Sequence, residues 1–223
     1  MTNRRLVIQT VGALTVCAVL VAFCYVAIDR SVALWADNHP WLSPAWISNS
    51  PDVIIGMEVV APVLLVLAAI RRLWGPWRRW EAMVAVLALN VLAMFILKQG
   101  LKWIFGRPCP KFWLAYEHSV IENAAAYQFH WFQGGRSPYD SFPSGHATIA
   151  CGLVALMWVF WPKWRWPAGI VLLALLVCLV TTNYHYVGDV IAGSCLGWLG
   201  GCWTARFLPN WMKPEANGST IHD

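Results

Sequence analysis

The chain has 223 residues, of which 59% are hydrophobic and only 12% are charged, and its formal net charge is +5. A soluble domain carries roughly twice that share of charged residues, and the apolar residues here form blocks that are too long for soluble helices. The composition therefore excludes an ordinary soluble domain. The positive charge follows from membrane topology, as shown below, and requires no nucleic-acid partner.

The first apolar run covers residues 6–28 and directly follows Arg4 and Arg5. It is longer than the core of a signal peptide, and no small-x-small cleavage site follows it. We therefore expect a retained first membrane span. Residues 31–39 come next and predict a short interfacial helix.

Five more apolar runs follow, and each approaches or reaches the ~20 residues that span hydrocarbon. Tryptophans cluster at the ends of these runs, as in the interfacial belts of membrane proteins. We expect an all-α membrane domain of six transmembrane helices over residues 1–213, followed by a short cytoplasmic tail at 214–223. The five later spans are predicted at 53–70, 82–101, 147–161, 167–182 and 187–207.

The basic residues predict the orientation. In a six-span topology, ten of the 16 lysines and arginines lie on one side, which the positive-inside rule assigns to the cytoplasm. Both termini are then cytoplasmic, and the largest loop, residues 102–143, faces the periplasm or cell exterior. We expect an integral protein of a bacterial inner (plasma) membrane. The ten residues are Arg4, Arg5, Arg71, Arg72, Arg78, Arg79, Lys163, Arg165, Arg206 and Lys213.

Cysteine and histidine spacing predicts neither a disulfide framework nor a metal site. Six of the seven cysteines fall within predicted spans, and only Cys109 lies in an outer loop. No His, Cys or Asp cluster has the spacing of metal ligands. We therefore expect no metal and no other cofactor.

The segment Pro143-Ser144-Gly145-His146 lies where the fourth span begins. Free backbone N–H groups and the positive end of the helix dipole make such a position an anion site. Gly145 lets an anion approach the backbone, and Ser144 adds a hydroxyl donor. An ordinary capped helix explains Pro-Ser-Gly about equally well, but a histidine at the membrane boundary favours a functional role.

His185 and Asp189 stand four residues apart at the start of the last span, so they can contact each other on one helical face. A carboxylate bound to one ring nitrogen fixes the tautomer and leaves the other nitrogen as a nucleophile. The alternative is a satisfied interfacial histidine with Asp189 as a solvated helix cap.

Basic side chains near the outer loop could hold a phosphate group. Lys102 and Arg107 could clamp phosphate oxygens, although snorkelling at the membrane interface also explains them. Lys98, one turn before Lys102, fits snorkelling better. Glu58 and Asn90 are polar residues inside predicted spans, where they could support a site or join helices.

On these residues the chain resembles the type 2 phosphatidic acid phosphatase (PAP2) family, relatives of the vanadium haloperoxidases, over residues 98–205. The family motif Pro-Ser-Gly-His is complete at 143–146. His185 and Asp189 match the end of Ser-Arg-x5-His-x3-Asp, and Lys102 matches the start of Lys-x6-Arg-Pro.

The resemblance implies a role for each matched residue. His185 would attack phosphorus and form a phosphohistidine, His146 would protonate the leaving alkoxide, and Asp189 would orient His185. The resemblance also implies that no metal is needed. The phosphate oxygens would be held by Lys102, Ser144 and the Gly145 amide.

Both arginines of the family motifs are missing from their usual positions, which Cys109 and Leu179 occupy. Two other arginines lie nearby. Arg107-Pro108 repeats the Arg-Pro step two residues early, and Arg136 precedes His146 by ten residues. We hypothesise that Arg107 or Arg136 replaces a lost arginine in substrate binding.

The sequence thus predicts a membrane lipid-phosphate phosphatase that hydrolyses a phosphomonoester or pyrophosphate headgroup. A phospholipid or polyprenyl phosphate suits such a site because its apolar tail can stay in the bilayer. Candidate substrates are phosphatidate, phosphatidylglycerophosphate, polyprenyl pyrophosphate and a lipid A phosphate. Two alternatives are a lipid phosphotransferase that uses the same histidine and a catalytically degenerate relative that binds or transports phospholipid. A haloperoxidase is disfavoured because vanadate would require the missing arginines, and the sequence does not predict the oligomeric state.

Overall fold

A computed structural model of the chain describes residues 3–42, 52–117 and 127–212, which form helices and turns and contain no strand. The predicted cytoplasmic tail at 214–223 lies outside the described residues. The all-helical prediction is confirmed for the described residues.

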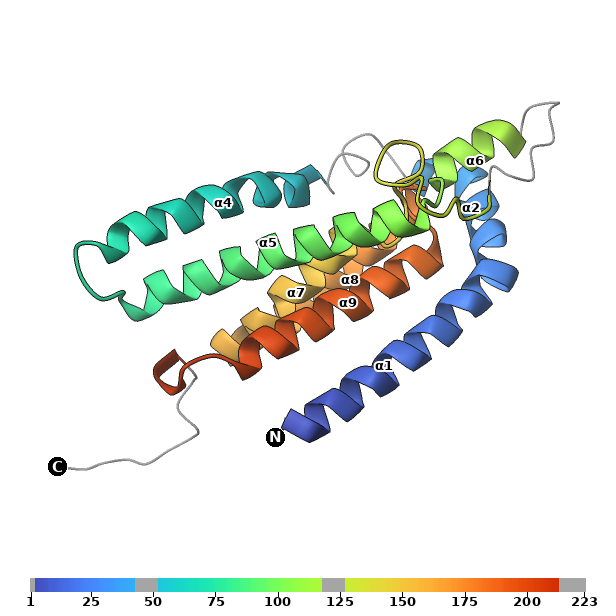
Figure 1. The fold of residues 1–223 in the computed structure, drawn as a ribbon. Coiled ribbons are helices and arrows are strands. Elements are labelled where there is room, and N and C mark those ends of the chain that lie inside the picture. The colour runs from blue at the N-terminus through green and yellow to red at the C-terminus, as the bar shows by residue number, and fades with distance from the viewer. Residues whose placement is uncertain (1–2, 43–51, 118–126, 213–223) are drawn as a thin grey trace.

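Each predicted span corresponds to one long helix (Figure 1). The first span is α1 (Asn3–Phe23), which a π-helical turn (Cys24–Ile28) extends. The short helix expected at 31–39 is α2 (Asp29–Asp37), and α6 (Pro110–Glu117) lies in the large loop. The remaining spans are α4 (Asp52–Arg72), α5 (Arg79–Phe105), α7 (Gly145–Phe160), α8 (Arg165–Thr181) and α9 (Val187–Arg206).

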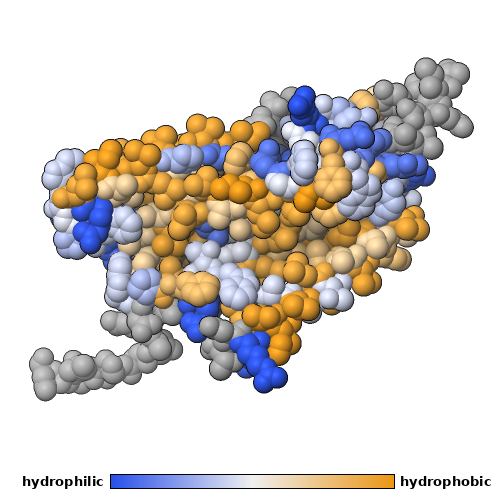
Figure 2. Space-filling model, viewed as in Figure 1, coloured by the Kyte–Doolittle hydropathy of each residue, from blue (hydrophilic) through white to orange (hydrophobic). Residues whose placement is uncertain are grey.

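The helices have the length and surface of membrane spans. Within the described residues, four helical segments are long and apolar enough to cross a bilayer, and α7 is a shorter apolar helix of 16 residues. Hydrophobic residues cover much of the bundle, whereas hydrophilic residues gather near α2 and α6 (Figure 2). The chain is an integral membrane protein, and the count of six spans stays a prediction. The four segments are Arg4–Asp37, Ile54–Arg72, Arg79–Ala115 and Pro162–Thr181.

The contact between α7 and α9 forms the centre of the bundle (Figure 1). It is close because glycines of α9 face the backbone of α7. A Cβ atom added to Gly193 would lie 2.3 Å from the carbonyl oxygen of Ser144, and one added to Gly197 would lie 2.1 Å from that of Thr148. Small residues allow membrane helices to approach in this way. The contact brings the start of α7 next to the start of α9, so both histidine motifs lie at one end of the bundle.

Replacing Gly197 with alanine is expected to destabilise the protein by about 1–3 kcal/mol, because the added methyl group must push α9 away from α7. The apparent midpoint of thermal unfolding in detergent measures this effect. Gly100→Ala in α5 is the matched control, because nothing lies within 4 Å of the added Cβ. It should leave the midpoint unchanged or raise it slightly. Equal midpoints for the two variants would contradict the close packing of α7 on α9.

Candidate active site

A cavity of about 540 Å³ opens at the end of the bundle where α5 ends and α7 and α9 begin. Four of the site residues predicted from the sequence line it: Lys102, Gly145, His146 and His185. Cys109 also lines the cavity. The fold therefore gathers residues from both histidine motifs and from the end of α5 around one space.

The two histidines face each other across the wall of this cavity. The Nδ1 atom of His146 lies 3.4 Å from the Nε2 atom of His185, and the ring centroids are 5.7 Å apart. His146 belongs to the first turn of α7, whereas His185 lies in the turn between α8 and α9. The backbone holds this turn, because the N–H of His185 donates to the carbonyl of Leu179 at 3.1 Å. Asn183 supplies the left-handed residue that the turn requires, with φ of 55°.

A serine connects His185 to Asp189. The hydroxyl of Ser141 donates to Oδ2 of Asp189 at 2.6 Å, and its oxygen lies 3.3 Å from Nδ1 of His185. Since the Ser141 hydroxyl donates its hydrogen to the carboxylate, its oxygen can accept a hydrogen bond from an N–H at Nδ1 of His185. We assign the ring proton of His185 to Nδ1 on this basis, which leaves the Nε2 lone pair facing His146.

His185 and Asp189, paired in the sequence analysis, lie within ion-pair distance, but the hydrogen bonds between them run through Ser141. Nδ1 of His185 and Oδ2 of Asp189 are 3.9 Å apart. The physical reason is that α9 begins at Val187, so His185 precedes the helix and shares no helical face with Asp189. Asp189 is the third residue of α9, and its carboxylate instead accepts from the N–H of Tyr186 at 3.1 Å.

Burial controls the protonation of His185. The side chain is 5% exposed, and removal from water lowers its pKa well below the usual range for histidine. The positive charge of Lys102 and the neighbouring His146 lower this pKa further. His185 is therefore neutral at physiological pH, which is the state that a nucleophile requires.

Arg107 does not reach the cavity, so the expectation that it binds substrate is corrected. Its guanidinium is fully buried and donates to Oδ1 of Asp189 at 2.6 Å and to Oδ2 of Asp29 at 2.7 Å. It also donates to the Tyr127 hydroxyl at 3.1 Å. Asp29 receives a further bond from the N–H of Gly188 at 2.9 Å. The physical reason is charge balance, because two buried carboxylates require a buried cation.

Arg136 is exposed and does not line the cavity either. Neither arginine therefore stands where the hypothesis of a replacement arginine needs it. At one lost-arginine position, Leu179 is fully buried and packs with Ala147 and Val190. At the other position, the Cys109 side chain lines the cavity.

Lysines supply the positive charge of the cavity. Lys98, Lys102 and Lys111 all line it, and Nζ of Lys111 also lies 4.5 Å from the ring of Tyr184. Nζ of Lys98 lies 2.5 Å from Oε1 of Glu58. The sequence analysis interpreted Lys98 as a snorkelling residue. Its position within a predicted span was a sign of a functional role, because an ionisable residue inside a span usually has a partner and a function.

Ser144 caps α7 and is fully buried, and it does not line the cavity. Its hydroxyl oxygen accepts from the N–H of Ala147 at 3.3 Å, and its own N–H donates to the carbonyl of Asp189 at 3.0 Å. The structure shows Pro-Ser-Gly as a capped helix start, and the anion site stays a prediction that the place of Gly145 on the cavity lining permits. Among the residues that the structure describes, no group of three or more His, Cys, Asp or Glu side chains could hold a metal ion.

Comparison with known proteins identifies the family. The model of the PAP2 superfamily matches residues 80–213, which is more than half of the chain. The chain belongs to the PAP2 superfamily. None of the curated proteins matches it. The crystal structure of a transmembrane PAP2-type phosphatidylglycerolphosphate phosphatase from Bacillus subtilis is similar to this PAP2 chain, with 17% sequence identity and a TM-score of 0.48. The match covers 89% of this chain and 94% of that chain.

The Arg107→Met variant of this PAP2 protein is expected to lose about 3–5 kcal/mol of stability, because Asp29 and Asp189 would remain buried without a cation. Thermal unfolding in detergent, followed by size-exclusion chromatography, measures the loss. Arg136→Met is the matched control in the same loop and should change stability by less than about 0.5 kcal/mol, because Arg136 is exposed. A parental midpoint for Arg107→Met would contradict the central place of this ion triad.

Proposed function

We propose that this PAP2 protein hydrolyses the phosphomonoester or pyrophosphate headgroup of a membrane lipid through a phosphohistidine on His185. The observation that carries the proposal is the pair of ring nitrogens of His146 and His185, 3.4 Å apart on a cavity lined by lysines. The positive-inside distribution of basic residues supports a site on the outer face of the membrane.

In the first step, the Nε2 lone pair of His185 attacks phosphorus in line with the leaving oxygen. The N–P bond forms as the P–O bond to the lipid breaks. The step requires His146 in its protonated form, which the negative charge of bound phosphate favours, and His146 gives this proton to the departing oxygen. The positive charge that develops on His185 is stabilised by the hydrogen bond from Nδ1 to Ser141 and by the negative charge of Asp189, which Arg107 holds in place. Lys102 and the start of α7 at Gly145 stabilise the phosphoryl oxygens.

In the second step, water attacks the phosphohistidine. His146, now neutral, accepts a proton from the water, the N–P bond breaks, and inorganic phosphate leaves. His185 returns to its neutral form. The cycle consumes one water and releases one phosphate, together with a lipid alcohol from a phosphomonoester or a lipid monophosphate from a pyrophosphate. Every proton transfer in this cycle uses a residue at the cavity.

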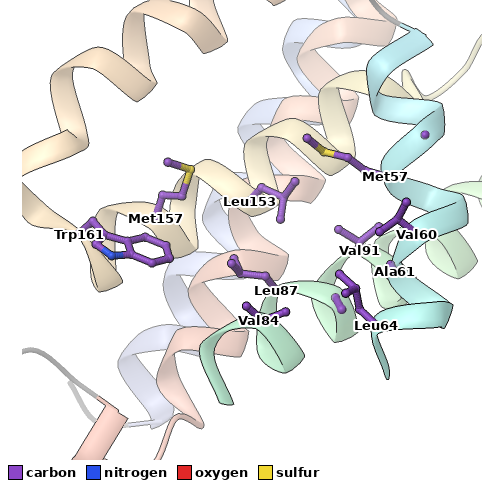
Figure 3. A pocket seen from close by; sticks show the side chains of 12 residues that line it. Met57, Val60, Ala61, Leu64, Val84, Leu87, Val91, Leu153, Met157 and Trp161 are labelled. Carbon is purple, nitrogen blue, oxygen red and sulfur yellow. The ribbon is translucent and has the colours of Figure 1, made fainter. Parts of the chain in front are cut away.

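An apolar groove supports a lipid as substrate. It has a volume of about 520 Å³ and is lined by apolar side chains of α4, α5 and α7, including Val60 and Val91, and by Trp161, which directly follows α7 (Figure 3). Ile55 of α4 and Phe95 of α5 line the cavity, and the next turns of the same helices line the groove. Helix α7 beside it is 16 residues long, or about 24 Å. A hydrocarbon chain can therefore lie in the groove while its headgroup occupies the cavity.

The His185→Ala variant is expected to release no phosphate above background, because the nucleophile is absent. Free phosphate is measured with purified protein in detergent and a panel of phosphatidate, phosphatidylglycerophosphate, polyprenyl pyrophosphate and lipid A phosphate. His39→Ala is the control, because His39 lies on the chain after α2 and outside the cavity lining. Hydrolysis at the parental rate by His185→Ala would exclude the mechanism, and phosphate transferred to an alcohol instead of released would indicate the phosphotransferase.

The Val60→Trp variant tests the lipid groove. The indole should fill space that a hydrocarbon chain would occupy, so kcat/KM should fall several-fold for a long-chain phosphatidate and stay unchanged for a short-chain one. Val59→Trp, at the neighbouring exposed position that does not line the groove, is the matched control and should affect neither substrate. An equal loss for both chain lengths in Val60→Trp would argue against the groove as the lipid site.

A further inference from the structure

We propose that Lys98 is a phosphate-binding residue of this site, and that phosphate displaces the carboxylate of Glu58 from its ammonium group. The inference rests on the proposed function, because it concerns the same cavity. It gives the site a cation in place of a missing motif arginine, and it gives α4 a part in substrate binding.

The position of Lys98 supports this role. A Cβ atom added to Gly145 would lie 2.7 Å from Cδ and 2.8 Å from Nζ of Lys98, so the lysine side chain passes directly over this glycine. Gly145 is the first residue of α7, where free N–H groups and the helix dipole attract an anion. The ammonium group of Lys98 therefore lies beside the place where the phosphoryl oxygens would bind.

The charges around the start of α7 favour binding of an anion. The start of α7 is positive, and Lys98, Lys102 and Lys111 line the cavity, so the positive groups outnumber the two carboxylates of its lining, Glu58 and Asp140. The carboxylate of Glu58, from α4, is the anion that Lys98 contacts in the structure, at 2.5 Å. A phosphate carries more charge than a carboxylate and can also contact Lys102 and the backbone of α7. Phosphate should therefore displace Glu58 from Lys98.

The partial exposure of the pair agrees with an exchange of partners. The side chains of Lys98 and Glu58 are 9% and 12% exposed, and both line the cavity. A pair that served only to join α4 to α5 would need no access to the cavity. The two roles predict opposite effects of removing Glu58, which makes them separable by experiment.

The experiment measures binding of inorganic phosphate to the purified full-length protein in detergent by equilibrium dialysis. Lys98→Met should weaken binding about tenfold or more, because one charge-assisted contact is lost. Glu58→Gln should strengthen binding several-fold, because the competing carboxylate is gone. Lys98→Arg should bind nearly as well as the parent, which guards against a methionine variant that fails to fold.

Two further variants complete the test. Lys163→Met removes an exposed lysine at the start of the α7–α8 connection and should leave phosphate binding unchanged. The double variant Lys98→Met/Glu58→Gln should bind phosphate as weakly as Lys98→Met, because Glu58 acts through Lys98. Unchanged binding in Lys98→Met, weaker binding in Glu58→Gln, or no binding by the parental protein would each overturn the inference.

Phosphate binding requires no turnover, so the two proposals can fail separately. A parental protein that binds phosphate through Lys98 but hydrolyses no lipid phosphate would refute the proposed function alone. A protein that hydrolyses lipid phosphate, with phosphate binding and kcat/KM unchanged in Lys98→Met, would refute the role of Lys98 alone.

Discussion

Two carboxylates and one guanidinium lie together where water does not reach, so each of Asp29, Arg107 and Asp189 depends on the other two. Burial of a single such charge would cost several kcal/mol, and only the assembled group is tolerated. The three residues come from the start of α2, the segment after α5 and the first turn of α9. The site end of the bundle can therefore form only when these three segments meet. Ser141 and His185 are then positioned by Asp189.

This use of Arg107 determines how phosphate can be held. The buried guanidinium of Arg107 donates to two carboxylates and cannot also bind a substrate in the cavity. The cations along the cavity lining are lysines. Lysine is a compact point charge, whereas arginine offers a planar, bidentate donor set. A cavity built on lysines should thus select its ligand by charge more than by the geometry of its oxygens.

The sequence was sufficient for the helices and for the central residues of the site. In a bilayer each span must form its own backbone hydrogen bonds, so a long apolar run predicts a helix. The local motifs identified His146, His185 and Lys102, which line one cavity. It failed where partners are distant in the chain. Arg107 lies 78 residues from Asp29, and Lys98 lies 40 residues from Glu58.

Some of the missed features had a signal in the sequence. Asp29 ends an apolar run and Glu58 lies inside one, which are positions where an acid requires a partner. Gly193, Gly197 and Gly201 recur at every fourth residue of α9, as expected for a helix that packs closely. Ser141 had no such signal, because a serine in a loop fits too many roles.

The glycine contact between α7 and α9 holds the two histidines in place but does not include α4. It fixes the starts of the two helices, and with them both histidines, against each other. Helix α4, which forms a wall of the groove and carries Glu58, packs mainly along α5 and lies outside this contact. Bilayer thickness and lateral pressure should therefore act on the wall formed by α4 before they reach the two histidines. If the proposed function holds, lipid composition would change how readily a substrate enters or leaves the groove and would have less effect on the chemical step.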